Sequence, residues 1–267
     1  MARAVSRVLA GLLCLAALSF SAFTQVMVGK LSDEWEVEPG HVYQGTIDIT
    51  NLQTAPATVR IYQTDYLFFS DGASQTPAPG TLERSNAGWV TLELDSPYAT
   101  IPGMSVLSVV YQVRVPDDLQ LAGTYWSMVN VDPEVAVLAP EQGVGIQNIF
   151  GYGIQIVTSI GRLGERAVTL LGSSVVTNLS GTTFFADLEN TGEYWLRPVV
   201  SLEVFDQLGN SLGRIESASG KLRIYPGCSV RHWIALPQLE PGTYPAILLI
   251  DNLDEYLWGA QVTVNVK

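Results

Sequence analysis

One stretch of this chain occurs twice, and the repeat limits the folds that the chain can adopt. The first copy runs from Ile101 to Asp132 and the second from Tyr225 to Asp251. Each copy has Pro-Gly, a strand-like run that ends at a proline, then Gly-Thr-Tyr, then a second run that ends at an aspartate seven residues after the tyrosine. Pro-Gly and Gly-Thr are turn signals, so each unit predicts turn, strand, turn, strand. The shared order indicates two related modules in tandem.

The rest of the chain also has the pattern of short strands. Apolar and polar residues alternate in Val42 to Thr50 and again in Ala260 to Val266, as in strands with one buried face. Glycine and proline separate such runs, and no segment shows convincing helical periodicity. We therefore predict an all-β protein of two tandem immunoglobulin-like antiparallel β-sandwiches. The tyrosine of each Gly-Thr-Tyr resembles a tyrosine corner, whose hydroxyl bonds to nearby backbone.

The run Ile146 to Ile160 is longer than an ordinary strand. Its even positions are mostly large and apolar and its odd positions small or polar, and Gly151 and Gly153 suggest a kink or bulge. Two interpretations remain open. The whole strand fills the first core, or its beginning, Ile146 to Tyr152, projects past the sandwich and meets a partner.

The chain divides into three parts. Residues 1–24 have the pattern of a signal peptide, with Arg3 and Arg7 before a short apolar run, although a retained membrane anchor is an alternative. The glycines and charges of Gly161 to Arg166 then suggest a boundary between one module at 25–163 and another at 164–267. We expect an exported protein, periplasmic or extracellular, whose mature chain does not span a membrane.

Charge and cysteine content exclude several function classes. The chain is 47% hydrophobic, which excludes a disordered chain, and its formal net charge of -12 disfavours nucleic acid and anionic membranes as partners. Of the two cysteines, Cys14 lies in the predicted signal peptide, so Cys228 has no disulfide partner in the mature chain.

No motif predicts catalysis. His232 and Cys228 are four residues apart on one strand face, and we expect core packing there rather than a metal site or catalytic pair. His41 lies beside a turn, and the acidic run Asp251 to Glu255 lacks the EF-hand spacing. The sequence also lacks a Gly-x-Ser-x-Gly elbow and a phosphate-binding glycine loop. We therefore predict no enzyme, no catalytic residue, no metal and no cofactor.

Tryptophan is the one residue type that suggests a different ligand. Six tryptophans could line a sugar-binding face, although aromatic residues in sandwiches more often pack in cores or between domains. They are Trp35, Trp89, Trp126, Trp195, Trp233 and Trp258.

Two segments carry a resemblance to a known family. Glu38-Pro39-Gly40 leading into Gly45-x-Ile47-x-Ile49-x-Asn51, and Ile154-Gln-Ile-Val-Thr158, resemble the bacterial periplasmic pilus chaperones over residues 25–267. In that family the last strand of the first module completes a pilin subunit by strand addition. The resemblance implies a protein or peptide client, pilin-like or from the cell surface. It also implies that a set of apolar residues binds the polypeptide: Ile146, Phe150, Tyr152, Ile154 and Ile156.

The family also holds its client's C-terminal carboxylate with an arginine on the first strand and a lysine on the last. Gln155 stands at the position that we match to that lysine, and it carries no charge. The nearest cations are Lys30 and Arg162, which we take as candidate carboxylate anchors. The other hypothesis for this chain is a structural or adhesive cell-surface protein, with carbohydrate binding as one form of it.

Overall fold

The structure is a computed structural model that describes residues 26–134, 150–161, 164–179 and 181–266. These residues form antiparallel sheets with one parallel pair and a single short 3-10 helix, η1 (Ala87–Trp89), which confirms the predicted all-β class. In this part of the chain no helix is long and apolar enough to cross a membrane. The predicted signal peptide, Ile146 and Arg162 lie outside the described residues.

The first sandwich packs two sheets around an apolar core that includes Ile49, Tyr111 and Ile156. One sheet has the order β1 (Val26–Val28), β3 (Val42–Asn51), β9 (Val106–Arg114) and β7 (Val90–Leu92). The other has the order β2 (Ser32–Val37), β11 (Tyr152–Ile160), β10 (Gly123–Glu134), β4 (Ala57–Thr64) and β8 (Tyr98–Ile101).

The second sandwich repeats this plan around a core that includes Phe184, Leu202 and Leu248. Its sheets have the orders β12 (Val168–Asn178), β13 (Gly181–Asn190), β16 (Ser229–Ala235), and β15 (Ser211–Glu216), β14 (Val199–Phe205), β17 (Gly242–Asp251), β18 (Leu257–Val266). The duplicated units supply β9 and β10 in the first sandwich and β16 and β17 in the second. Because β9 pairs with β3 as β16 pairs with β13, and β10 with β4 as β17 with β14, the predicted repeat of strands is confirmed.

A buried asparagine ties the Pro-Gly turn of each repeat to the turn that follows β3 or β13. The Asn51 and Asn190 side chains are fully buried at the ends of β3 and β13. Each amide donates to a carbonyl four residues further on and to a carbonyl just before the Pro-Gly turn, that of Ile101 at 3.1 Å and that of Ile224 at 2.8 Å. These side-chain bonds to buried backbone oxygens hold each Pro-Gly turn against the sandwich.

The two predicted tyrosine corners differ. The hydroxyl of Tyr244 donates to the carbonyl of Glu240 at 2.8 Å, four residues upstream, as a tyrosine corner does. Tyr125 instead packs on the ring of Trp89, with 4.8 Å between ring centroids. Only the second copy of the repeat therefore shows the expected hydroxyl bond.

The chain crosses from one sheet to the other between β1 and β2. β1 pairs antiparallel with β3, and after Gly29 to Leu31 the chain continues as β2, which pairs parallel with β11 in the opposite sheet. β2 was not predicted from the sequence, because the run Ser-Asp-Glu-Trp-Glu-Val has few apolar residues. Its Asp33 is nevertheless buried and accepts a hydrogen bond from the buried Tyr111 hydroxyl and one from Lys30 at 2.5 Å. Gly45 makes room for that hydroxyl, since an added Cβ there would overlap it.

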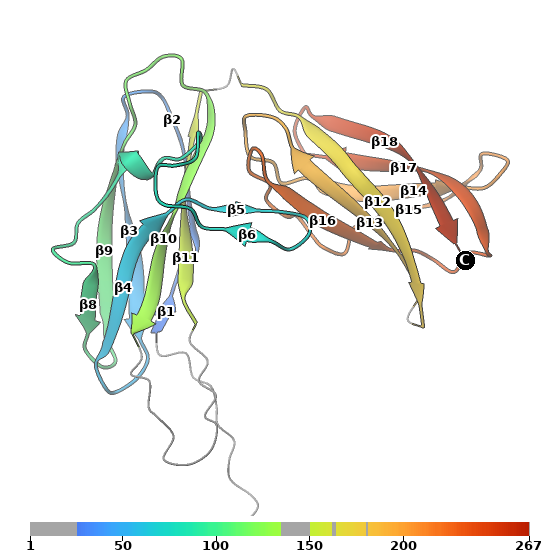
Figure 1. The fold of residues 1–267 in the computed structure, drawn as a ribbon. Coiled ribbons are helices and arrows are strands. Elements are labelled where there is room, and N and C mark those ends of the chain that lie inside the picture. Colours follow the sequence, from blue (N-terminus) through green and yellow to red (C-terminus); the bar gives the residue numbers. More distant parts are fainter. Residues whose placement is uncertain (1–25, 135–149, 162–163, 180, 267) are drawn as a thin grey trace, which may run out of the picture.

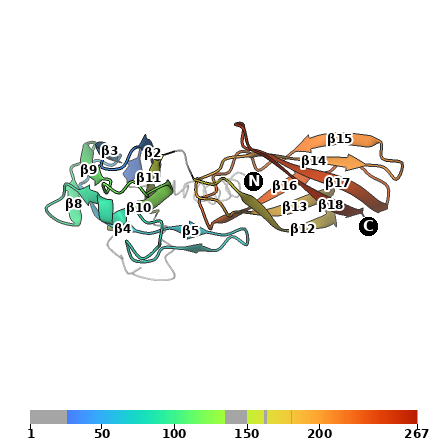
Figure 2. The same ribbon diagram turned by 90° about the horizontal axis from the view of Figure 1, so that it is seen from above.

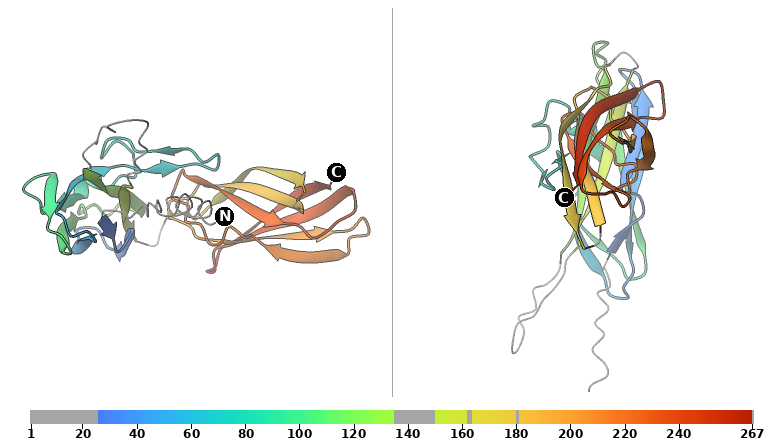
Figure 3. Two further views of the ribbon diagram at one scale, coloured as in Figure 1. Left: turned by 90° about the horizontal axis from the view of Figure 1, so that it is seen from below. Right: turned by 90° about the vertical axis from the view of Figure 1, so that its right-hand side faces the viewer.

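The two sandwiches form a bent, two-armed molecule (Figure 1). A hairpin of β5 (Leu67–Phe68) and β6 (Ser74–Gln75) leaves the first sandwich and lies against the second, as Figures 2 and 3 also show. The Ser70 backbone N–H donates to Ser229 Oγ across this contact at 2.9 Å. We call the surface where the sandwiches meet the junction.

We predict that Asn51→Ala and Asn190→Ala each destabilise the protein by on the order of 2–3 kcal/mol, because each removes the buried side-chain hydrogen bonds that hold a Pro-Gly turn against the sandwich. Denaturant unfolding at neutral pH measures the effect. Asn265→Ala is the matched control, since Asn265 lies exposed on β18 and accepts one bond from Thr243. Equal, small effects in all three variants would contradict the role of the buried pair.

Candidate functional site

The strands β10 and β11 are buried on both faces. Val129 and Ile156 point into the first core, whereas Trp126 and Val157 pack with the core of the second sandwich. The Trp126 indole stacks on the ring of Tyr225, with 4.6 Å between centroids and 9° between planes. Its Nε1–H donates to the carbonyl of Tyr66 at 2.7 Å, so the ring is fixed from both sides.

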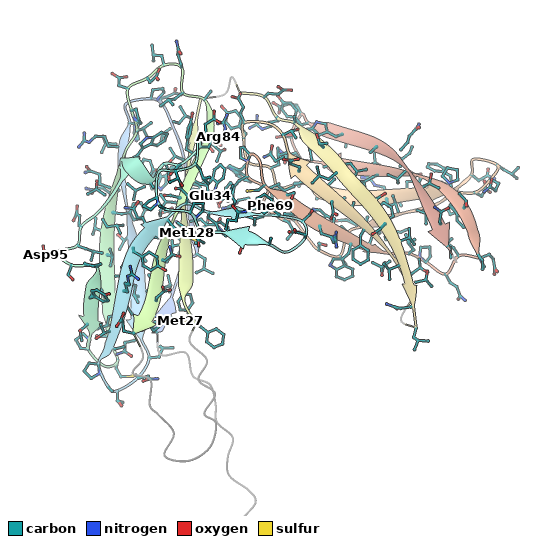
Figure 4. The ribbon with its side chains drawn as sticks, viewed as in Figure 1. Met27, Glu34, Phe69, Arg84, Asp95 and Met128 are labelled. Carbon is teal, nitrogen blue, oxygen red and sulfur yellow. The ribbon has the colours of Figure 1, made fainter. Side chains whose placement is uncertain are left out.

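Polar contacts complete the junction. The Thr124 N–H donates to the carbonyl of Glu193 at 2.7 Å, and the Tyr194 hydroxyl donates to the carbonyl of Ile160 at 2.8 Å. Arg84 forms a 3.0 Å ion pair with the Glu193 carboxylate (Figure 4 shows Arg84 beside the second sandwich). Backbone bonds, stacked rings and an ion pair therefore hold the sandwiches in one arrangement and keep the face of β11 toward the junction in a defined place.

The predicted polypeptide-binding residues have different exposures. Ile154 is 2% exposed and Ile156 is fully buried, so both side chains belong to the first core. Tyr152 is half-buried and its hydroxyl donates to the carbonyl of Val26 at 3.0 Å, which closes the end of the sandwich away from the junction. Phe150 is 52% exposed just before β11. Their binding role stays a prediction, and of the described members Phe150 has the most accessible side chain.

The glycines of this strand have a packing role and not the expected bulge. The register between β10 and β11 runs without a shift from Ile160 to Tyr152, through Gly153. Met128 on β10 lies over Gly153, and an added Cβ would be 2.3 Å from its sulfur. A Cβ at Gly151 would be 2.3 Å from a carboxylate oxygen of Asp132. Close neighbours on β10 thus explain both glycines.

Part of the outer edge of β11 has no strand beside it. The parallel partner β2 begins with Ser32 opposite Gln155, whose N–H donates to the carbonyl of Leu31 at 3.0 Å. Peptide groups point alternately to the two sides of a strand, so those of Gly153 point the same way as those of Gln155. Among the described strands none pairs with residues 152–154 on that side. We call these three residues the open edge.

A cluster of polar side chains lies where β2 begins. Arg223, from the second sandwich, donates to Ser32 Oγ at 2.8 Å and forms an ion pair with Glu34, which Figure 4 shows at the junction. The Tyr225 hydroxyl, which accepts a bond from Arg223 at 2.9 Å, donates to Gln155 Oε1 at 2.5 Å. Burial raises the pKa of Tyr225 to about 12, although the nearby guanidinium acts in the opposite direction. We call these five residues the junction cluster.

Arg223 was not among the site residues predicted from the sequence, whereas Lys30 was. The cation matched to the family's lysine was sought on β11, where Gln155 stands, but the structure brings a guanidinium to Gln155 from the other sandwich. The only signal in the sequence for Arg223 was its position two residues before Tyr225, where the second copy of the repeat begins. Lys30 lies in the turn between β1 and β2 and is paired with Asp33 at 2.5 Å. The anchor role of Lys30 stays a prediction.

Cys228 and His232 occupy the second core. Burial raises the pKa of the Cys228 thiol to about 11, which keeps it in the unreactive protonated form. Burial lowers the pKa of His232 to about 4, and its Nδ1 lies 3.1 Å from Ser217 Oγ. Within the described residues no group of three or more histidine, cysteine or acidic side chains is placed to hold a metal ion.

The tryptophans are divided among separate parts of the molecule. Trp126 is in the junction, Trp195 lies 5.2 Å from the Arg223 guanidinium, and Trp89 packs on Tyr125. The remaining three belong to different strands: Trp35 to β2, Trp233 to β16 and Trp258 to β18. This distribution does not form the single aromatic face that a sugar-binding site would need.

No protein-family model and no curated protein sequence matches the chain. Several solved structures are similar in fold. The class 5 fimbriae chaperone CfaA is 11% identical with a TM-score of 0.45, covering 89% of this chain and 98% of that one. The E. coli chaperone DraB is 12% identical with a TM-score of 0.43, covering 90% and 98%. A chain from the chaperone–tip adhesin complex of CFA/I fimbriae is 11% identical with a TM-score of 0.46, covering 89% and 97%.

We predict that the second sandwich loses stability as the pH falls from about 6.5 to 4. Unfolded histidine has a pKa near 6.5 and folded His232 one of about 4, so the unfolded state binds the proton first. The loss attributable to this group is on the order of 3 kcal/mol. Thermal unfolding of the wild type and of His232→Gln is measured at several pH values. The difference between the two profiles gives the contribution of His232, because the carboxylates titrate in both proteins. Parallel profiles would show that His232 contributes nothing.

Proposed function

We propose that this protein is an exported, non-enzymatic chaperone that binds an extended polypeptide by strand addition at the open edge of β11. The observation that carries the proposal is that β2 covers β11 only from Gln155 onward. The backbone groups of Gly153 are thus directed to a position where a client strand would continue the sheet. Half-exposed Phe150 lies at the entrance to that position.

The proposed client strand runs parallel to β11, in line with β2. In that direction its C-terminal end meets the beginning of β2, where the carbonyl of Leu31 already accepts from Gln155. A client carboxylate there would lie near Lys30 and the Arg223 guanidinium. Because Glu34 now pairs with Arg223, we infer that the client carboxylate competes with Glu34 for that guanidinium.

The client class follows from the sequence resemblance to pilus chaperones. We propose a pilin-like or surface subunit that lacks one strand of its own sheet, and a role in the assembly of a pilus or another surface structure. Residues 1–24 would direct the chain to the periplasm, and residues 25–163 and 164–267 would form the two modules. The outer face of β11 near the open edge carries glycine, so backbone bonds and Phe150 would contribute more to recognition than a row of large side chains.

We predict that Phe150→Ser weakens co-purification of the client and leaves the melting temperature nearly unchanged. Ile154→Ser, in contrast, removes a buried side chain worth roughly 1.5–3 kcal/mol and should destabilise the first sandwich. Tyr98→Ser is the matched control for Phe150, because Tyr98 is 49% exposed on the distant edge strand β8. If Phe150→Ser destabilises the fold as much as Ile154→Ser, this strand serves only the core and the proposal fails.

We predict that Arg223 discriminates between a free carboxylate and an amide at the client's C-terminus. The probe is a ten-residue peptide of alternating valine and threonine, with N-terminal lysines for solubility, as the acid and as the amide. Calorimetry should show that the wild type binds the acid about 10-fold more tightly than the amide, because a charge-assisted hydrogen bond contributes about 1.5 kcal/mol. Arg223→Gln should bind the two peptides equally.

Glu34→Gln tests the competition directly. It should tighten binding of the acid, because it removes the carboxylate that now occupies the guanidinium, and leave binding of the amide unchanged. Equal binding of both peptides to all three proteins would remove the anchor from the proposal. Absence of any binding, together with an unchanged partner profile for Phe150→Ser, would refute strand addition itself.

A further inference from the structure

A cavity of about 400 Å³ lies in the junction, on the side where the β5–β6 hairpin leaves the first sandwich. Apolar side chains from both sandwiches line it: Leu67, Leu82 and Trp126 from the first, and Pro226 from the second. Its volume is typical of small-molecule sites, which often form where two domains meet. None of the described residues that line it belongs to β2, β11 or the junction cluster, so the cavity is separate from the proposed client site.

Two carboxylates stand on the walls of this cavity, one from each sandwich. Glu83 comes from the first sandwich and is exposed, and Glu189 comes from β13 of the second and is half-buried. Among the described residues neither carboxylate forms an ion pair or accepts a side-chain hydrogen bond. We call these two residues the cavity carboxylates.

The arginines close to the cavity carboxylates in the fold are bound to other acids. Arg84, which also lines the cavity, forms the 3.0 Å ion pair with Glu193, so its charge is offset within the wall. Arg231, on the neighbouring strand β16, donates to both carboxylate oxygens of Asp187, at 2.7 and 2.8 Å. The chain has 26 acidic and 14 basic residues, and at this cavity the acidic excess leaves two charges without a partner.

The lining specifies the chemistry of a ligand. An apolar chain can lie along Leu67 and Leu82, as the methylene stem of a lysine lies along apolar surface, while a positive charge at each end meets a carboxylate on each wall. A cation is also the ligand that a chain of net charge -12 attracts. We propose that the cavity binds a short aliphatic diamine, whose two ammonium groups pair with the cavity carboxylates. Because Glu83 and Glu189 belong to different sandwiches, the bound diamine links the two across the junction.

Calorimetry of the mature protein with 1,5-diaminopentane at low ionic strength tests the proposal. We expect one site with a dissociation constant of about 1 mM, because two partly exposed ion pairs and a short apolar chain are few contacts. The monoamine 1-aminopentane should bind about fivefold more weakly, since it forms one of the two ion pairs. Pentane-1,5-diol, which has the same chain and no charge, should not bind, and added salt should weaken the diamine by screening.

Variants of the cavity carboxylates locate the site. Glu83→Gln and Glu189→Gln should each weaken diamine binding about fivefold and abolish its advantage over the monoamine. Glu216→Gln is the matched control, because it removes the same charge from β15, outside the cavity, and should bind the diamine like the wild type. Melting curves establish that each variant is folded, and alanine replaces glutamine in any variant that is not.

The lysine side chain of a protein is a second source of an alkylammonium group, and N-acetyl-lysine methylamide represents it. This compound carries one ammonium group, so it should bind as weakly as 1-aminopentane. Binding of it as tight as that of the diamine would overturn the proposal. So would the absence of saturable diamine binding up to about 20 mM, twentyfold above the expected dissociation constant. Equal losses of affinity in Glu216→Gln and in the two cavity variants would overturn it as well.

Discussion

The first sandwich depends on one crossing of the chain from one of its sheets to the other. β1 and β2 are consecutive, yet β1 completes the sheet of β3 and β2 completes the sheet of β11. The change of sheet draws Asp33 into the core, where the Tyr111 hydroxyl and Lys30 bind it. A buried carboxylate is costly unless it is paired and hydrogen-bonded, so these two partners and the space above Gly45 are conditions of the crossing. The same crossing decides where β2 begins, and thereby where β11 loses its neighbour.

The junction converts two sandwiches into one unit with a defined face. Since β10 and β11 have a core on each side, Trp126 and Val157 point out of one sandwich and into the packing of the other. The stack of Trp126 on Tyr225 and the backbone bond from Thr124 to Glu193 act at the same place. Arg223 reaches the first strands of the chain for this reason, and the junction cluster exists only while the sandwiches keep this arrangement.

The sequence predicted what depends on neighbours along the chain and missed what depends on distant ones. Alternation identified β3 and β18, and the repeat identified β9, β10, β16 and β17, because these patterns are local. The charged run of β2 has no such pattern, and its place follows from parallel pairing with β11. The half of β12 from Gly172 onward lacks such a pattern, because Gly172 to Ser174 interrupt the apolar alternation. For the candidate site, the sequence predicted strand β11 together with Phe150. It did not predict Arg223, because this residue contacts side chains of the other module and no spacing in the sequence indicates such a contact.

The parallel pairing of β2 with β11 also has a consequence for the order of folding. The two strands lie more than a hundred residues apart in the sequence and occupy opposite ends of the first sandwich's chain. Closing so long a loop is slow compared with forming the hairpins between the two strands. β2 is synthesised before most of the first sandwich, but it pairs with β11 last. Until it does, the outer edge of β11 has no neighbouring strand along its whole length. A nascent molecule therefore passes through a stage in which its own β2 and any passing extended chain compete for the same hydrogen bonds.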